Sequence, residues 1–304
     1  MKKPKLWWRA IRPFSFTVSV IPPLLGGLIA ARDYTDLKFN WIYFILTIAG
    51  CVLAHAGSNM LSDYYDFKSR VDRKGTFGSS GVLVAELMKP EQLLKGAWIA
   101  LGAAALIGLY FILALNHSLY LLGLMLAGGG LGYFYTAKPF ELKYHALGDI
   151  AVFIAFGSAM SLGAYFIQTR MFSWTPVLYA LPIALLVDAI LHSNNLRDIQ
   201  NDKAVHITTF AAILGGHRSK WFYYFLVFGA YILTLILVLS AGLSWLALLS
   251  WLSLPLALKL ATMMAHKENL DVSRFAAIDA LTAQLHSAFG LLFLLGLTLD
   301  YFVL

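Results

Sequence analysis

The sequence of 304 residues contains a single cysteine and very little charge. Cys51 lies within an apolar run, so the chain has no internal disulfide and no site built from several thiolates. Asp, Glu, Lys and Arg together make up only 13% of the residues, against 60% that are hydrophobic. A soluble domain cannot bury so much apolar surface, so the sequence predicts an integral membrane protein.

Long apolar runs separated by short polar loops recur along the chain. This pattern favours membrane-spanning helices over a β-barrel, whose strands alternate in shorter segments. The first run follows a basic, tryptophan-bearing N-terminus and is too long for the core of a signal peptide, so we interpret it as a span. The sequence therefore predicts one all-α, polytopic membrane domain over residues 1–304. Nine candidate spans lie at about residues 13–31, 41–62, 96–115, 118–136, 146–168, 175–194, 221–241, 244–265 and 286–304.

The positive charges lie mostly on one side of these spans. Assigning the 23 Lys and Arg residues to alternate sides puts all but Arg32, Lys38 and Arg170 on the side of the N-terminus. Because cytoplasmic loops carry an excess of Lys and Arg, we expect a multi-pass protein of the inner, cytoplasmic membrane with its N-terminus and longer loops in the cytoplasm. Orientation accounts for the net charge of +7, and we expect no nucleic-acid partner.

Two Asn- and Asp-rich segments follow the second and sixth predicted spans. They read "NMLSDYYDFKSRVD" from residue 59 and "NNLRDIQNDK" from residue 194, and each opens one of the two longest loops on the N-terminal side. Their matching places suggest two related halves, about residues 1–140 and 141–304, which bring both segments to the same membrane face.

On a helix, residues three and four apart share a face, so each segment forms one polar stripe. The stripes are Asn59, Asp63 and Asp66 in the first segment, and Asn194, Asp198 and Asp202 in the second. Four carboxylates on one cavity repel each other unless cations lie between them. Oxygen-rich clusters suit Mg²⁺, which keeps positions for phosphate oxygens, so the pattern suggests a site for a diphosphate bound as its magnesium complex.

Several cations accompany these carboxylates: Lys68, Arg70, Arg73, Lys74, Arg197 and Lys203. Such groups hold phosphate oxygens and stabilise a departing diphosphate. A prenyl diphosphate combines such a head with an apolar tail that fits between helices, so we expect it as the substrate. Loss of its diphosphate gives an allylic carbocation, which a nucleophile or an internal double bond captures.

Asp188 lies inside the sixth predicted span, with His192 one turn later and Asn195 close to the same face. An ionisable residue inside the membrane suggests a function, here to orient or deprotonate an acceptor. The alternative is a hydrogen-bonded Asp/His pair that holds two helices together.

These residues resemble the UbiA superfamily of intramembrane aromatic prenyltransferases, and within it the 1,4-dihydroxy-2-naphthoate prenyltransferases of menaquinone synthesis. Five segments carry the resemblance in family order: "RPFSFTVSVIPPLLGG" at 12–27, "SDYYDFKSRVD" at 62–72, "YTAKPFELKYHALGDIAVFIAFG" at 135–157, "NNLRDIQND" at 194–202 and "TAQLHSAFGLLFLLG" at 282–296.

The resemblance implies a nine-helix bundle around a central cavity that opens to lipid, and an Mg²⁺-dependent transfer from a polyprenyl diphosphate to an aromatic acceptor. In the naphthoate branch the prenyl group replaces the acceptor's carboxylate, which leaves as CO₂. The implied metal–diphosphate residues are Asp63, Asp66, Asp198 and Asp202. The expected substrate contacts are Asn59, Lys68, Arg70, Asn194, Asn195, Arg197, Lys203, Asp188, His192 and Tyr135, the last as an aromatic shield for the carbocation.

The chain departs from the family's pattern at several positions. Ser62 stands where an Asn is usual, Gly81 where related sequences carry Arg, and "HITT" at 206–209 where a "GKRT"-like segment is common. Another acceptor, or cyclisation of the prenyl chain itself, is therefore an alternative reaction. An ion-coupled transporter is the alternative of another class, which the position of the carboxylates at helix ends disfavours.

Overall fold

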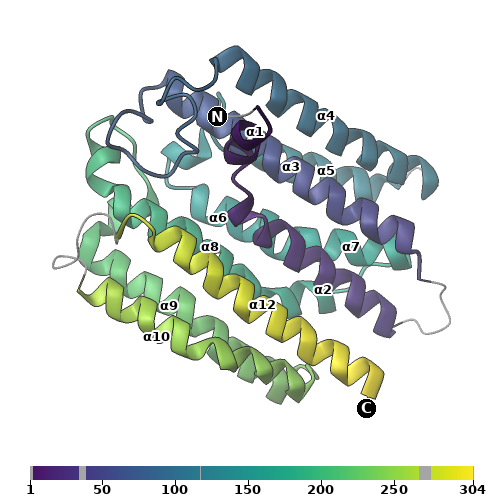
Figure 1. Cartoon of the computed structure of the whole chain (residues 1–304). Coiled ribbons are helices and arrows are strands. Elements are labelled where there is room, and N and C mark those ends of the chain that lie inside the picture. Colours follow the sequence, from purple (N-terminus) through teal and green to yellow (C-terminus); the bar gives the residue numbers. More distant parts are fainter. Residues whose placement is uncertain (1–2, 34–38, 117, 267–274, 304) are drawn as a thin grey trace.

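The computed structural model describes residues 3–33, 39–116, 118–266 and 275–303, and over that range the chain is built of helices (Figure 1). The only β pairing among these residues is an isolated bridge between His145 and Thr208. The elements are α1 (Lys3–Ile11), η1 (Pro13–Ser15), α2 (Thr17–Asp33), α3 (Trp41–Lys68), α4 (Pro90–Ala114), α5 (Leu119–Tyr133), η2 (Leu142–Tyr144), α6 (Gly148–Val152), the π-helical η3 (Phe153–Ala159), α7 (Met160–Thr169), α8 (Thr175–Lys203), α9 (Phe210–Ser240), η4 (Trp245–Ser253), α10 (Leu254–Ala265) and α12 (Ile278–Val303).

Seven helical segments in the described part of the chain are long and apolar enough to cross a membrane. They are α3, α4, the α6–α7 segment, α8, α9, the η4–α10 segment and α12. The α1–η1 segment and α2 meet at 56° and make an eighth span if they count as one, whereas α5 has only 15 residues. The predicted all-helical membrane fold is confirmed. By length and composition alone, the described residues contain seven or eight spans, so the predicted count of nine is not confirmed.

The main core lies where α2, α8, α9 and α12 meet. Ile21, Ile183, Leu226 and Phe289 are almost completely buried there, and α8 packs against α9, α12 and η3. Lipid supplies little hydrophobic drive for helix association, so close packing must hold these helices together. Gly26 shows how close: a Cβ on this residue of α2 would collide with the carbonyl oxygen of Ser161 on α7.

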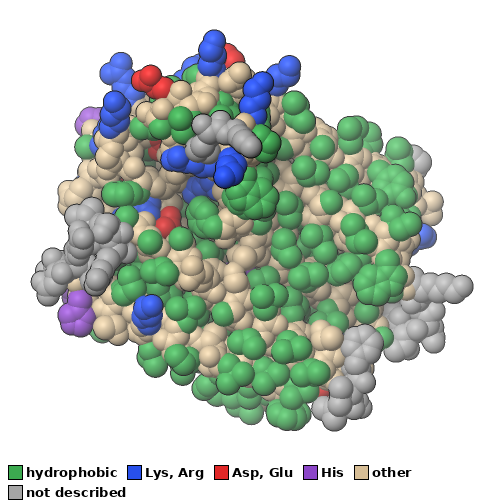
Figure 2. Space-filling view, in the orientation of Figure 1, with side chains coloured by type: hydrophobic (Ala, Val, Ile, Leu, Met, Phe, Trp, Pro, Cys, Tyr) green, Lys and Arg blue, Asp and Glu red, His purple; other side chains and the backbone are tan. Residues whose placement is uncertain are grey.

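The outer surface is apolar, as contact with lipid requires. Trp98, Ile99 and Leu106 on α4 are among its large exposed side chains. Figure 2 shows hydrophobic side chains over most of one face of the molecule, with Lys and Arg gathered mainly at the top of the view. In Figure 1, α3 and α4 lie towards the top and α9 and α10 towards the bottom, with α8 between them.

Two helices carry the Asn- and Asp-rich segments beyond the apolar part of their spans. α3 begins after Asn40, whose Oδ1 accepts a hydrogen bond from the Tyr43 N–H (3.0 Å), and runs without a break to Lys68. α8 likewise continues to Lys203. Both predicted polar stripes therefore lie on regular helix, so the three- and four-residue spacings place their side chains on one face.

Candidate active site

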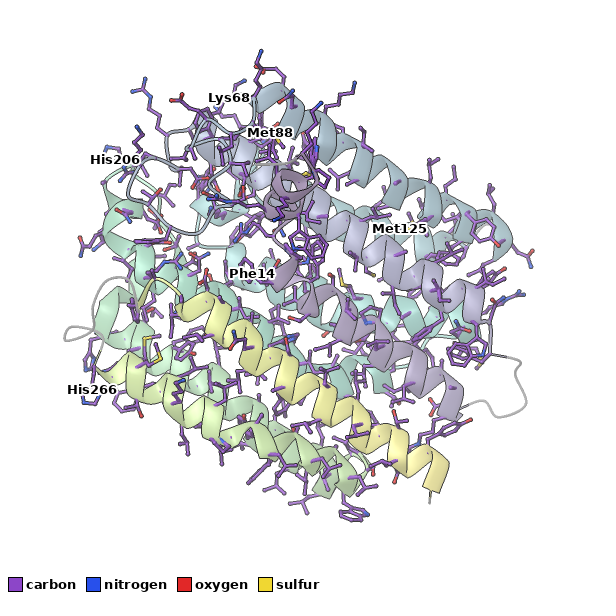
Figure 3. The ribbon with its side chains drawn as sticks, in the orientation of Figure 1. Phe14, Lys68, Met88, Met125, His206 and His266 are labelled. Atoms are coloured by element: carbon purple, nitrogen blue, oxygen red, sulfur yellow. The ribbon has the colours of Figure 1, made fainter. Side chains whose placement is uncertain are left out.

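A cavity of about 480 Å³ is enclosed by α3, α4, α5, the η3–α7 segment and α8. Its polar end is lined by Arg12, Asn59, Asp72, Lys143, Asn194, Asn195, Asp198 and Asp202. The remainder is mostly apolar, with Thr47, His55 and Ser58 as exceptions, and it is rich in small residues, among them Ala54, Ala105, Gly128, Ala155 and Gly163. Phe14 and Met125, both labelled in Figure 3, line the cavity from η1 and α5 respectively. The lining fits a molecule with a charged head and an apolar tail.

Asp63, on α3, is buried against the loop that follows its helix. Its Oδ2 accepts a 2.9 Å hydrogen bond from the Ser80 N–H, and its Oδ1 lies 3.6 Å from Nη1 of Arg12. Arg9, on α1, donates to the Ser80 carbonyl oxygen (2.6 Å) and so holds the loop in place. Among the described residues, neither Asp63 Oδ1 nor Arg12 Nε has a hydrogen-bond partner, although both atoms are buried. Such atoms have the capacity to bind a further polar ligand.

Asp66, nearly one turn further along α3, has both carboxylate oxygens engaged. Lys143 Nζ donates to Oδ2 (2.6 Å) and the Tyr144 hydroxyl donates to Oδ1 (2.6 Å). Burial by itself lowers the pKa of Lys143, but the Asp66 carboxylate together with Tyr135, Tyr144 and Asp72 outweighs that effect, and the pKa is raised. Burial and the same carboxylate raise the pKa of Tyr144. Lys143 is therefore a half-buried cation, and Tyr144 is a neutral donor.

Asp72 adds a carboxyl group to this end of the cavity from the loop after α3. It is buried and belongs to the cavity lining. Burial, followed by repulsion from the Asp66 carboxylate, raises the pKa of Asp72 to about 7, although Lys143 acts in the opposite direction. The first cluster is thus larger than its helical stripe.

The second cluster, on α8, is organised by Arg197. This side chain donates to the carboxylate of Asp198 from Nη2 (2.7 Å) and Nε (3.2 Å), and its Nη1 lies 3.1 Å from Asp279 Oδ1. It also donates to Asn194 Oδ1 (2.5 Å) and to the carbonyl oxygen of Ala276 (2.9 Å). Arg197 therefore fixes the end of α8 to the chain at the start of α12.

Apart from Asp188 and His192, the predicted site residues fall into three groups. Those that line the cavity are Asn59, Tyr135, Asn194, Asn195, Asp198 and Asp202. Those held beside its polar end by the contacts above are Asp63, Asp66 and Arg197. Lys68, Arg70 and Lys203 are exposed and lie outside the cavity lining. Lys68, labelled in Figure 3 near the end of α3, lies over the Tyr64 ring with its Nζ 5.3 Å from the ring centre. Substrate contacts of these three cations stay predictions.

His192 pairs with a different carboxylate from the one its spacing suggests. Its Nδ1 lies 2.9 Å from Asp149 Oδ1, on α6, and its Nε2 lies 2.7 Å from the Ser219 hydroxyl, on α9. Asn195 donates to the other oxygen of Asp149 (3.4 Å), and Asp188 lies beside Asp149. The network joins three helices, and only Asn195 of these residues belongs to the cavity lining. This arrangement favours the interpretation of Asp188 and His192 as residues that hold helices together.

Lys143 and Tyr144 are not among the predicted site residues. They are 77 and 78 positions from Asp66, so no helical spacing relates them to it. The one available signal is their place in the segment "YTAKPFELKYHALGD", which also contains Tyr135. Arg12 is a similar case, because its only signals are the basic N-terminus and its place at the start of the segment "RPFSFTVSVIPPLLGG".

The carboxylates do not form a metal cage by themselves. Within the described part of the chain, no three His, Cys, Asp or Glu side chains are grouped so that they could hold a metal ion. Mg²⁺ characteristically binds through one or two carboxylates together with substrate phosphates, rather than in an all-protein cage. The oxygen donors along the polar end, including the unpartnered Asp63 Oδ1, fit a Mg²⁺ ion of that shared kind.

Known proteins resemble this chain along nearly its whole length. The UbiA prenyltransferase family matches residues 19–299. "1,4-dihydroxy-2-naphthoate octaprenyltransferase" of Bacillus subtilis (strain 168) is 32% identical over 98% of this chain and 94% of its own. "UbiA prenyltransferase domain-containing protein 1" of Xenopus tropicalis is 33% identical over 95% of this chain and 81% of its own. The structure of a UbiA homolog from Archaeoglobus fulgidus bound to GPP and Mg²⁺ has a TM-score of 0.63 at 15% identity, covers 95% of this chain and 99% of its own, and shows the same fold.

Proposed function

We propose a specific reaction for this chain, which belongs to the UbiA prenyltransferase family. It transfers the prenyl group of a polyprenyl diphosphate to 1,4-dihydroxy-2-naphthoate in an Mg²⁺-dependent reaction of menaquinone biosynthesis. The predicted family and the predicted enzyme class are confirmed. The name of the Bacillus relative supports the naphthoate acceptor. The Xenopus relative is equally similar and its name states no acceptor, so another aromatic acceptor is the alternative.

The observation that carries this proposal is the composition of the cavity. One space of about 480 Å³ has carboxylates, amides and cations at one end and small apolar residues elsewhere. A prenyl diphosphate has its charge confined to one end in the same way. The tail would lie between the helices among residues such as Ala105 and Gly128, while the diphosphate meets the polar end.

The polar end supplies groups for both a metal and a diphosphate. Asp63, Asp66, Asp198 and Asp202 would hold Mg²⁺, which when bound neutralises charge on the leaving diphosphate. Arg12 and Lys143 line the same end and are placed to bind phosphate oxygens through charge-assisted hydrogen bonds. These cations stabilise the negative charge that develops as the diphosphate departs.

The reaction exchanges bonds at the first carbon of the prenyl group. The carbon–oxygen bond to diphosphate breaks, and diphosphate leaves with the electron pair. A π electron pair of the acceptor ring forms the new carbon–carbon bond. The acceptor's carboxylate then leaves as CO₂, and the electron pair of its bond returns to the ring.

Tyr135, Asn194 and Asn195 line the region where these steps would occur. Burial raises the pKa of Tyr135, so its phenol stays neutral and its ring face can stabilise an allylic cation. The two amides offer donors and acceptors for the hydroxyl groups of an aromatic acceptor. No hydrogen bond from another described residue reaches Asn195 Oδ1, while its Nδ2 is held by Asp149.

We further infer that the polar end faces the cytoplasm across the inner membrane. It lies next to α1 and the Lys- and Arg-rich loops, which the charge distribution of the sequence assigns to that side. Water-soluble diphosphate would then be released directly into the cytoplasm, while the prenylated product stays among the lipids.

The proposal is tested with purified protein in lipid nanodiscs, Mg²⁺ and a radiolabelled polyprenyl diphosphate. We expect release of diphosphate and formation of a prenylated, decarboxylated product when 1,4-dihydroxy-2-naphthoate is present. Equal release without any acceptor would favour cyclisation or hydrolysis of the donor. Absence of release with this and other aromatic acceptors would contradict the proposed reaction.

A further inference from the structure

The ammonium group of Lys143 lies among the carboxylates of the polar end. Its Nζ is 2.6 Å from Asp66 Oδ2. It also interacts electrostatically with Asp72 and Asp202, which belong to the two different acidic clusters. Lys143 is therefore a half-buried cation that the two clusters share, in a region where a divalent metal would have to neutralise the same charges.

Both oxygens of Asp66 already accept hydrogen bonds, and Oδ2 accepts two. The Tyr144 hydroxyl occupies Oδ1 and Lys143 occupies Oδ2, where the Ser62 hydroxyl also donates (3.2 Å). A metal that binds Asp66 through Oδ2 must displace Lys143 or Ser62, because both lone pairs of that oxygen are already used. Displacing Lys143 alone would leave a half-buried ammonium group without its carboxylate partner, which is energetically costly.

We propose that Lys143 takes the place of the metal on Asp66 in the substrate-free protein and transfers to the diphosphate when the substrate enters, so that metal and diphosphate bind together. This inference rests on the proposed function and adds that the metal and the diphosphate bind to the site together. The diphosphate supplies oxygens for Lys143 at the moment the metal takes over Asp66. Neither ligand alone satisfies both partners of the ion pair.

The side chains around Asp66 differ in their freedom to move. Lys143 lines the cavity, and its flexible stem carries a single point charge with 21% of the side chain exposed. The loop that carries Lys143 is anchored at the following residue, where the carbonyl oxygen of Tyr144 accepts a hydrogen bond from the Thr208 N–H (3.2 Å). Arg197, the cation of the second cluster, is fixed by contacts to both Asp198 and Asp279. Lys143 can therefore swing into the cavity without moving the backbone.

The experiment measures metal binding rather than turnover. Mn²⁺ binding to the protein in nanodiscs is followed by electron paramagnetic resonance, with and without inorganic diphosphate, and a protein-free titration corrects for the Mn²⁺–diphosphate complex. The proteins are the wild type, Lys143→Met and the control Lys138→Met, which changes an exposed lysine of the same loop.

For the wild type and Lys138→Met, we expect diphosphate to tighten Mn²⁺ binding by about tenfold or more. Lys143→Met should bind Mn²⁺ alone about tenfold more tightly than the wild type, and diphosphate should then add less than about threefold. Without metal, Lys143→Met should unfold at a lower temperature than the wild type, and added Mn²⁺ should restore more of its stability. The wild-type titration tests the coupling even if Lys143→Met does not fold.

Two results overturn the inference while leaving the proposed function in place: wild-type Mn²⁺ affinity that is the same with and without diphosphate, or Lys143→Met that matches Lys138→Met in both titrations. No Mn²⁺ binding by any of the proteins under either condition would overturn the proposed metal–diphosphate site and the inference with it.

Discussion

Replacing Arg197 by Met tests how strongly the second acidic cluster depends on one cation. The guanidinium lies 2.7 Å from the Asp198 carboxylate and 3.1 Å from that of Asp279, and the two aspartates expose only 10% and 11% of their side chains. Met fills much of the same volume but removes the charge and every hydrogen bond. Two carboxylates are then left close together in a largely desolvated place without a counter-ion.

Removing one partner of a buried ion pair costs about 3–5 kcal/mol, because the remaining charge is uncompensated. We therefore expect Arg197→Met to lower the Tm by on the order of 10 °C. The double variant Arg197→Met/Asp279→Asn should recover part of that loss, since one stranded charge is gone. The Tm is measured by intrinsic fluorescence in nanodiscs, with Arg218→Met as the control, because Arg218 is exposed on α9.

Two outcomes would refute this account of the cluster. One is a Tm for Arg197→Met within about 2 °C of the control variant, a shift that corresponds to less than about 1 kcal/mol. The other is a double variant that is less stable than Arg197→Met alone. Either result would mean that Asp198 and Asp279 do not depend on Arg197 for their charge balance.

Three further predictions concern the cavity and its supports. Gly163 lines the cavity and an added Cβ would meet nothing within 4 Å, so Gly163→Leu should fill part of the cavity and shorten the longest prenyl donor that is accepted by about one isoprenoid unit. Gly102→Leu, on α4 outside the cavity lining, is the matched control, and the same longest accepted donor for both variants would contradict the proposed position of the tail. Tyr144→Phe leaves Asp66 Oδ1 without its hydrogen-bond donor, so the free energy of unfolding, measured by chemical denaturation, should fall by about 1.5–3 kcal/mol. An unchanged free energy of unfolding would show that this hydrogen bond is not formed. Asp188→Asn should leave kcat and the acceptor KM unchanged, because Asp188 lies outside the cavity lining; a raised acceptor KM would instead assign it to acceptor binding.

Features with a local cause could be predicted from the sequence. Residues three and four apart share a helix face in any surroundings, so the stripes that contain Asp63 and Asp198 follow from spacing once α3 and α8 are known to be helical there. The all-helical membrane fold follows equally from local hydropathy. The relation between two halves of the chain stays a prediction.

Contacts between distant residues could not be predicted in this way. The pair of Lys143 and Asp66 depends on how the loop after α5 folds back over α3, and it has no periodic signature in the sequence. His192 could face Asp188 by spacing alone, but the packing of α6 against α8 places Asp149 within 2.9 Å of it instead. Lys68 is near the first cluster in sequence, yet its position at the end of α3 leaves it exposed.

The central claim is that the acidic stripes of α3 and α8 act as one metal–diphosphate site. The most direct test is the rate of Mg²⁺-dependent diphosphate release by Asp63→Asn, Asp198→Asn and the double variant, each checked for an unchanged helical circular-dichroism spectrum. We predict that each single change slows release by about 10²-fold or more and that the double variant is little slower than the slower single variant, because groups that act as a unit have strongly non-additive effects. Near-normal release by either single variant, or a double variant whose loss equals the product of the two single losses, would contradict the claim.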